Sequence, residues 1–130
     1  MPSAHPCETA FNETVRVRCF CGCRITGSVY LPHPVGIVLG QGVEVGDEVA
    51  IYQSVTLGAG RGGEYPRIER GVTLFANSVV AGGVCIGEGT VVGACVYLAR
   101  DTSPNSTVRQ AAPVVTETHH NGERETRRKN

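Results

Sequence analysis

From Leu39 onward, hydrophobic residues recur with a period of six positions. The leading aliphatic residues are Leu39, Val45, Ile51, Leu57, Ile68, Leu74, Val80, Ile86, Val92 and Leu98. Most are followed four positions later by a second, smaller residue: Val43, Val49, Val55, Val72, Ser78, Val84, Thr90, Val96 and Thr102. A period of six matches neither the 3.6-residue helix nor simple strand alternation. It predicts an all-β hexapeptide solenoid, a parallel β-helix with three short faces in each coil.

The chain divides into three predicted segments. Residues 1–17 are polar and predict an irregular N-terminal arm. Residues 18–108 predict a β-helix of about four coils, the first of them carrying Ile25 and Val29 in the apolar positions. Residues 109–130 predict a C-terminal segment and polar tail, because they lack the apolar residues that a core requires.

An interruption of the period predicts a loop that protrudes from the coils. Leu57 and Ile68 are eleven residues apart, five more than one repeat. The surplus falls near residues 58–67, whose glycines and proline favour turns. A smaller insertion of two residues lies between Leu31 and Leu39, and we expect it to form a bulge.

The composition agrees with a narrow aliphatic core. Aromatic residues make up 5% of the 130 residues, and glycine occurs 17 times, as the corners of a solenoid require. The formal net charge is zero, so no overall field predicts binding to nucleic acid or to an anionic membrane. The N-terminus does not resemble a secretory signal. We therefore expect a cytoplasmic chain whose six cysteines are reduced.

Three of the cysteines lie close together in the run Cys19-Phe20-Cys21-Gly22-Cys23. In an extended strand their thiols would share one side, which is an arrangement that can hold a soft metal. No second cluster or histidine pair accompanies them. We therefore favour small, partly buried residues in the first coil and expect no metal.

Four ordered segments carry more information than the repeat alone. They are Leu31-Pro32-His33-Pro34-Val35-Gly36-Ile37-Val38-Leu39-Gly40, Ile51-Tyr52-Gln53-Ser54-Val55-Thr56-Leu57-Gly58, Tyr65-Pro66-Arg67-Ile68 and Asp101-Thr102-Ser103-Pro104-Asn105-Ser106-Thr107-Val108. Together they resemble the serine acetyltransferase branch of the hexapeptide acyltransferases. The resemblance implies a left-handed β-helix, an exception to right-handed crossovers. It also implies a homotrimer with active sites between subunits.

The same resemblance implies acetyl transfer from acetyl-CoA to a hydroxyl of a small acceptor, either serine-like or a sugar. His33 matches the family's catalytic histidine, and imidazole suits this task because it titrates near neutrality. Tyr65 stands at the loop position that helps to hold the acceptor. The residues that match positions along the acetyl-CoA groove, including a cation for a phosphate, are Gly58, Ala59, Ala76, Ala94 and Arg100.

Three positions depart from the family pattern. Pro32 stands where an aspartate usually precedes the catalytic histidine, and Tyr65 replaces a histidine of the loop. Arg18 occupies the place, 15 residues before His33, where an acid should orient the imidazole. Without such a partner the tautomer of the imidazole is not fixed, and the ring is a weaker base. Within the N-terminal arm, Glu8 or Glu13 is an alternative partner.

Two hypotheses about the function, one an enzyme and one a binding module, therefore remain open. The first is a CoA-dependent O-acetyltransferase, and the second is a weak or inactive trimeric module that keeps the scaffold and binds CoA. A third scaffold relative, the γ-class carbonic anhydrase, needs three histidines around zinc. Only His33 lies within the repeats, which argues against that class.

Overall fold

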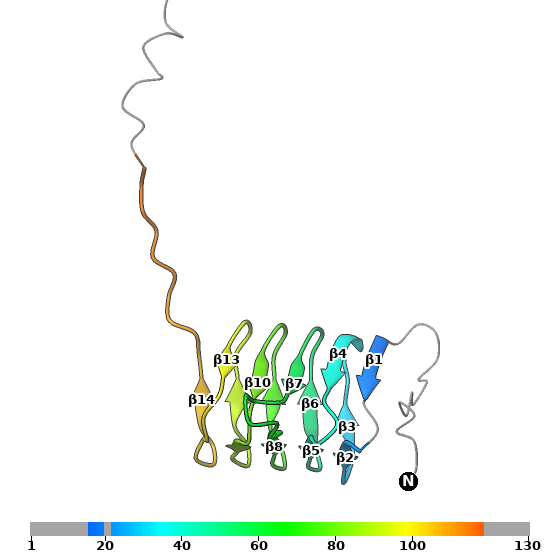
Figure 1. Ribbon diagram of the computed structural model, residues 1–130. Helices are drawn as coiled ribbons and strands as arrows, with labels where there is room; N and C mark the ends of the chain where they lie inside the picture. Colours follow the sequence, from blue (N-terminus) through cyan, green and yellow to red (C-terminus); the bar gives the residue numbers. More distant parts are fainter. Residues whose placement is uncertain (1–15, 20–21, 119–130) are drawn as a thin grey trace, which may run out of the picture.

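The computed structural model of the protein describes residues 16–19 and 22–118, and these residues form a parallel β-helix. Its strands are two to five residues long and stack along one axis into three sheets (Figure 1). Residues 109–118 leave the coils as an exposed, extended segment. The described part of the chain contains no helix long and apolar enough to cross a membrane.

Each sheet collects every third strand up to the last coil. Sheet A contains β1 (Arg16–Cys19), β4 (Val35–Leu39), β7 (Thr56–Gly58), β10 (Val79–Ala81) and β13 (Tyr97–Leu98). Sheet B contains β2 (Arg24–Ile25), β5 (Glu44–Val45), β8 (Arg67–Ile68) and β11 (Cys85–Ile86). Sheet C contains β3 (Val29–Tyr30), β6 (Val49–Ile51), β9 (Thr73–Leu74), β12 (Val91–Val92) and β14 (Thr107–Val108). Here β14 follows β12 directly after β13, because Thr102 joins sheet B only through an isolated bridge. The predicted parallel β-helix of about four coils is confirmed.

Three corners connect the sheets. The A–B corner comprises residues 40–43, 59–66, 82–84 and 99–101. The B–C corner comprises residues 26–28, 46–48, 69–72, 87–90 and 103–106. The C–A corner comprises residues 31–34, 52–55, 75–78 and 93–96. Several corner residues adopt a left-handed backbone conformation without being glycine: Glu48, Ser54, Asn77, Cys95 and Asn105.

The hydrophobic core consists of the predicted rows. The leading aliphatic residues from Leu39 to Leu98 are all at most 5% exposed. They stack in register, as where Ile68 lies opposite both Val45 and Ile86 in adjacent coils. Ile25 lies in the same row, opposite Val45, but is 46% exposed because β2 is the end strand of its sheet. The six-residue period therefore locates the core correctly, although the first coil is only partly covered.

One predicted row position is wrong. The spacing places Thr102 in the row of small residues, four positions after Leu98, but it lies opposite Ile86 in the leading row. The last coil reaches this row in four residues, whereas Val80 and Ile86 are six apart. Thr102 then accepts a hydrogen bond from the Gly87 nitrogen at 3.0 Å. The path from the leading residue of sheet A to that of sheet B is thus two residues shorter in the last coil than in the coil before it.

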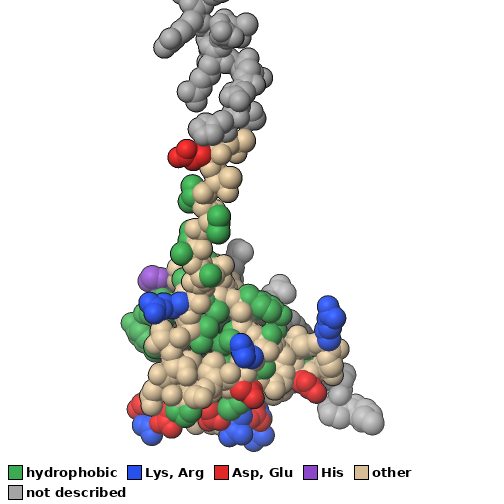
Figure 2. All heavy atoms as spheres, turned by 90° about the vertical axis from the view of Figure 1, so that its left-hand side faces the viewer, with side chains coloured by type: hydrophobic (Ala, Val, Ile, Leu, Met, Phe, Trp, Pro, Cys, Tyr) green, Lys and Arg blue, Asp and Glu red, His purple; other side chains and the backbone are tan. Residues whose placement is uncertain are grey.

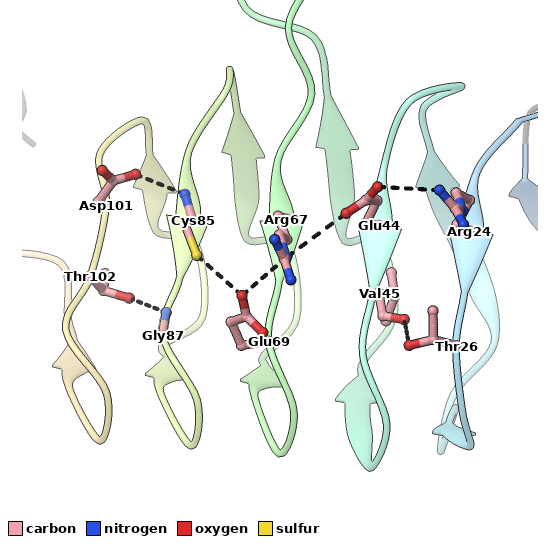
Figure 3. A network of polar contacts seen from close by, with 10 residues as sticks. All are labelled: Arg24, Thr26, Glu44, Val45, Arg67, Glu69, Cys85, Gly87, Asp101 and Thr102. Atoms are coloured by element: carbon pink, nitrogen blue, oxygen red, sulfur yellow. Dashed lines mark hydrogen bonds and ion pairs between the residues drawn. The ribbon is translucent and has the colours of Figure 1, made fainter.

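Sheet B carries the charged outer face. In its outward row Glu44 lies between Arg24 at 3.9 Å and Arg67 at 3.8 Å, and Arg67 also pairs with Glu69 at the start of the B–C corner, at 3.1 Å (Figure 3). The adjoining B–C corner adds an Arg70–Glu48 pair at 3.2 Å. In a view along the coil axis, acidic and basic side chains gather on one edge of the molecule (Figure 2). Exposed pairs of this kind contribute little to stability because water screens them, so they mark a solvated face.

Sheets A and C have mostly uncharged outer faces. The outward row of sheet A from its second coil onward is Val38, Thr56, Val79 and Tyr97. The outward row of sheet C is Tyr30, Ala50, Thr73, Val91 and Thr107. Tyr97 and Tyr30 are 70% and 66% exposed, which is unusual for large aromatic side chains. The three faces therefore differ in chemistry although the same repeat builds them.

Ser78 is a weak point of the core and yields a stability prediction. Its side chain is fully buried, and its hydroxyl has no hydrogen-bond partner among the residues that the structure describes. Val55 and Val96 occupy the same row in the adjacent coils. Because an unsatisfied buried hydroxyl costs about 1–3 kcal/mol, we expect Ser78→Val to raise the free energy of unfolding by about 1 kcal/mol. Urea denaturation measures the change.

Thr90→Val is the matched control. Thr90 is equally buried, but its Oγ1 lies 3.3 Å from Thr102 Oγ1 and 3.2 Å from the Ser103 carbonyl oxygen. Removing this hydroxyl breaks satisfied hydrogen bonds, so we expect a loss of about 1 kcal/mol. A Ser78→Val protein less stable than the wild type would contradict the prediction, because it would show that the row lacks room for a larger side chain at this position.

Candidate active site

His33 lies at the C–A corner, in the insertion between β3 and β4. The insertion forms a bulge, since the Val35 nitrogen donates to the His33 carbonyl at 2.8 Å and Gly36 has a φ of +69°. The imidazole is exposed, with its Nδ1 3.3 Å from the side-chain oxygen of Gln53. Its ring meets Tyr52 edge-on, with centroids 6.1 Å apart. The next coil therefore holds the histidine in place while the ring remains accessible.

The corner also aligns two of the predicted groove residues with His33. Gln53, Ala76 and Ala94 each follow the leading residue of sheet C by two positions, and His33 stands at the equivalent place after Leu31. Coils repeat at about 4.8 Å, so the row from His33 to Ala94 is about 14 Å long. Beyond Gln53 the row carries only methyl side chains, which leaves the corner shallow.

Gly58 and Ala59 lie at the other end of sheet A, where β7 meets the A–B corner. Gly58 is not among the residues with positive φ, so its backbone conformation does not require glycine. A Cβ added to it would meet only Thr56 Cγ2, at 3.9 Å. Among residues 16–19 and 22–118, neither backbone strain nor packing explains the missing side chain, and the space outside Gly58 is open.

The predicted loop is present but lies against the coils. Residues 59–66 join β7 to β8, and Figure 1 shows this green segment crossing the neighbouring coil. A Cβ on Gly60 would lie 2.8 Å from the Gly82 Cα, so the two backbones touch. The Gly60 nitrogen donates to the Glu64 carbonyl at 2.9 Å, which closes the loop on itself.

Tyr65 ends this loop and packs on the preceding coil. A side chain at Gly40 or Gly42 would collide with its ring, so both glycines make room for the aromatic face. Tyr65 is only partly exposed and contacts the hydrophobic core. Its ring therefore anchors the loop on the coils. The sequence predicted only a contact with the acceptor at this position and did not indicate this packing role.

Arg100 lies at the A–B corner of the last, shortened coil. Its side chain is exposed and forms no ion pair with any residue of the described ranges. A free guanidinium in this position is available to an anion.

The candidate residues thus form two groups at opposite edges of sheet A. His33, Ala76 and Ala94 lie on the C–A corner. The second group lies at or beside the A–B corner and consists of Gly58, Ala59, Tyr65 and Arg100. Three-residue strands, each about 10 Å long, separate the two groups within one chain. Within one chain the two groups therefore do not meet, and a ligand that contacts both has to span the width of sheet A.

Gln53 is the site residue that the sequence analysis missed. The family pattern predicts an acid 15 residues upstream of His33, but that position is Arg18, whose backbone pairs with Val38 in sheet A. The alternatives Glu8 and Glu13 lie outside the described residues. The available signal was the period itself, because Gln53 follows His33 by 20 residues and occupies the next coil of the same row.

The cysteines differ from the expectation of reduced thiols. Cys23 is disulfide-bonded in the structure, so the expectation is wrong at that position. Cys85 and Cys95 are free. Partial desolvation, and then the hydrogen bond from its thiol to Glu69 at 3.4 Å, raise the pKa of Cys85, so this thiol is a poor nucleophile near neutral pH (Figure 3). Within the described ranges no three His, Cys, Asp or Glu side chains converge as metal ligands do.

Comparisons with known proteins agree with this architecture. Residues 65–100 match the family model described as bacterial transferase hexapeptide (six repeats). A plasmid-encoded serine acetyltransferase of Synechococcus elongatus is 34% identical over 103 residues, which cover 69% of this chain and 32% of the relative. The serine acetyltransferase of Helicobacter pylori is 33% identical over 89 residues, covering 66% of this chain and 52% of the relative.

A solved structure gives the same result in three dimensions. The crystal structure of Neisseria gonorrhoeae serine acetyltransferase in complex with serine superposes with a TM-score of 0.69 at 32% identity. The match covers 73% of this chain and 40% of that structure. This chain therefore spans between about a third and about a half of the length of the curated relatives that it matches.

Proposed function

Given that the chain is a hexapeptide-repeat β-helix domain homologous to serine acetyltransferases, we propose that it transfers the acetyl group of acetyl-CoA to a hydroxyl of a small acceptor. Serine is the first candidate acceptor because the relatives carry that name, and small sugars are the second. The observation that carries the proposal is the row on the C–A corner. The exposed imidazole of His33 begins this row and is contacted by Gln53 and Tyr52. The row then continues with the methyl side chains of Ala76 and Ala94.

His33 acts as the general base in this proposal. The ring accepts the proton of the acceptor hydroxyl as the hydroxyl oxygen attacks the thioester carbonyl. The new C–O bond replaces the C–S bond, and the imidazolium returns its proton to the leaving thiolate, so protons and electrons balance. A positioned base contributes about 10²- to 10⁴-fold to such a step. No metal is needed for this chemistry.

The groove residues fit an extended acyl carrier. Neither the φ of Gly58 nor its described neighbours require a glycine, so the open space beside it is available to a ligand. Ala59 follows it at the start of the loop. Ala76 and Ala94 keep the C–A corner shallow, so a pantetheine arm reaches backbone groups there. Arg100 offers a free guanidinium for a phosphate. Tyr65, placed beside the same corner as Gly58, remains the proposed contact with the acceptor.

The charge distribution supports a homotrimer with sites between subunits. A closed three-fold ring uses two different patches of each subunit, because each contact joins one patch to the other patch of the neighbour. Sheets A and C supply two mostly uncharged faces, whereas sheet B is charged and suits solvent. A neighbouring copy also brings its own C–A or A–B corner to the site, which unites the two groups of residues that one chain keeps apart.

The central test is the activity of His33→Ala. Because the variant removes the base but no core contact, we expect transfer to fall at least about 100-fold with the assembly unchanged. A free-thiol release assay with acetyl-CoA, run against serine, homoserine, sugars and amino sugars, measures the loss, and light scattering monitors assembly. Full activity in the variant would refute the base assignment. A wild-type protein that binds CoA but acetylates nothing in the panel would favour the binding-module reading.

Gly58→Val tests the groove. Valine suits a strand, and the open space accepts its side chain, so we expect stability within about 0.5 kcal/mol of the wild type. The added side chain fills space proposed for the acyl carrier, so the Kd for CoA should rise at least about ten-fold, as expected when a ligand contact worth about 1.4 kcal/mol is lost. Calorimetric titration with CoA measures the affinity. Cys85→Val, on the outer face of sheet B, is the control, and equal CoA affinity in both variants would contradict the groove.

Val79→Arg tests the assembly. It places a charge in the middle of the outer row of sheet A, where burial against a neighbour would leave the charge unpaired. We expect the trimer to dissociate into folded monomers, as read by sedimentation and circular dichroism. Cys85→Arg makes the same addition on the solvent face of sheet B and should leave the trimer intact. The opposite pattern would move the interface to sheet B.

A further inference from the structure

We infer that Gln53 is the positioning residue of His33, and that this amide replaces the acid missing upstream. In this arrangement His33 Nδ1–H donates to the Gln53 side-chain oxygen, and the Nε2 lone pair is left free to take a proton. The two atoms are 3.3 Å apart across adjacent coils. The catalytic meaning of the inference rests on the proposed function, but the contact itself can be tested without turnover.

The backbone holds Gln53 firmly beneath the histidine. Its carbonyl oxygen accepts a hydrogen bond from the Asn77 nitrogen at 3.1 Å, in the following coil. The next residue, Ser54, donates its nitrogen to the Val35 carbonyl at 2.8 Å, in the preceding coil. Ser54 has a φ of +57°, so the turn is fixed on both sides of the glutamine. The glutamine Cα is therefore held by both adjacent coils.

An aromatic contact supports the same orientation of the imidazole. Tyr52 precedes Gln53 and meets the His33 ring edge-on, with an interplanar angle of 79°. Tyr52 in turn stacks on Phe75 of the next coil, with centroids 4.9 Å apart. His33 is thus held by an aromatic edge and by an amide, both from the loop that follows β6. Rotation of the ring would break both contacts at once.

The chemistry of an amide decides which tautomer this arrangement favours. An amide oxygen only accepts hydrogen bonds, so the ring nitrogen that faces it carries the hydrogen. The other nitrogen then has the lone pair that a general base needs. An amide performs this task without a charge, so it does not favour the imidazolium as a carboxylate would. The titratable side chain in contact with the His33 imidazole is Tyr52. No carboxylate of the described ranges forms an ion pair with His33.

The experiment compares Gln53→Leu and Gln53→Glu with the wild type. Leucine removes the acceptor at similar size, and glutamate keeps an acceptor while adding a charge. The matched control is Gln110→Glu, which makes the same substitution in the exposed C-terminal segment. Two readouts are used: ¹⁵N NMR of the His33 ring, assigned with His33→Ala, and the pH dependence of kcat/KM in the thiol-release assay.

The wild type should show the Nδ1–H tautomer. Gln53→Leu should lose this preference and lower kcat/KM about five- to ten-fold, as the loss of one neutral hydrogen bond predicts. In Gln53→Glu the carboxylate favours the imidazolium, so the ring's titration midpoint and the acidic limb of the profile should move roughly one unit to higher pH. Gln110→Glu should change neither readout.

Each outcome decides the inference. If Gln53→Leu keeps the wild-type tautomer, or if Gln53→Glu leaves the titration midpoint in place, Gln53 does not position His33. If the NMR changes occur as expected but no variant and no wild-type sample acetylates any acceptor, the positioning contact stands and the proposed acetyl transfer alone fails. The two claims therefore fail separately.

Discussion

The structure depends on the burial of one aliphatic side chain at every sixth position. A single three-sided coil cannot cover its own apolar side chains, since they are shielded from water only when further coils stack above and below. Ile68 illustrates this constraint, because it stacks between Val45 and Ile86 in a single row. Once the rows are in register, the backbone ladders are in register as well, and every outward position acquires a fixed place on a face or a corner.

The candidate functional residues occupy outward positions whose places are fixed by these rows. His33 and Gln53 are 20 residues apart but neighbours in space, because each follows a residue of the same inward row by two positions, His33 after the partly buried Leu31 and Gln53 after the buried Ile51. The alanines at 76 and 94 continue the same row. Insertions are tolerated where the core is not interrupted, namely at corners. The bulge at His33 and the loop before Tyr65 both lie there, so extra residues modify the site without disturbing the aliphatic rows.

Because the three faces differ in chemistry, they are not equally suited to contact with a neighbouring subunit. The ion pairs along sheet B contribute little stability because they are exposed, but they make that face costly to bury. Tyr97 and Val79 on sheet A have no such cost. A neighbouring subunit over the uncharged faces would also bring together the two groups of candidate residues that lie at opposite edges of sheet A. Assembly and catalysis are therefore parts of one proposal.

Residues that follow the period were predictable, and residues decided by contacts between coils were not. The sequence alone determined the solenoid, the buried rows and the loop after Gly58, because a repeat places each side chain inside or outside without reference to distant neighbours. His33 was singled out by the resemblance to serine acetyltransferases and not by the repeat, and its role as a base stays a prediction. Only the tertiary structure showed that Thr102 moves to the leading row, that Tyr65 packs on Gly40 and Gly42, that Cys23 is disulfide-bonded and that Gln53 contacts His33. These facts depend on corner lengths and side-chain directions, which a pattern of apolar positions does not encode.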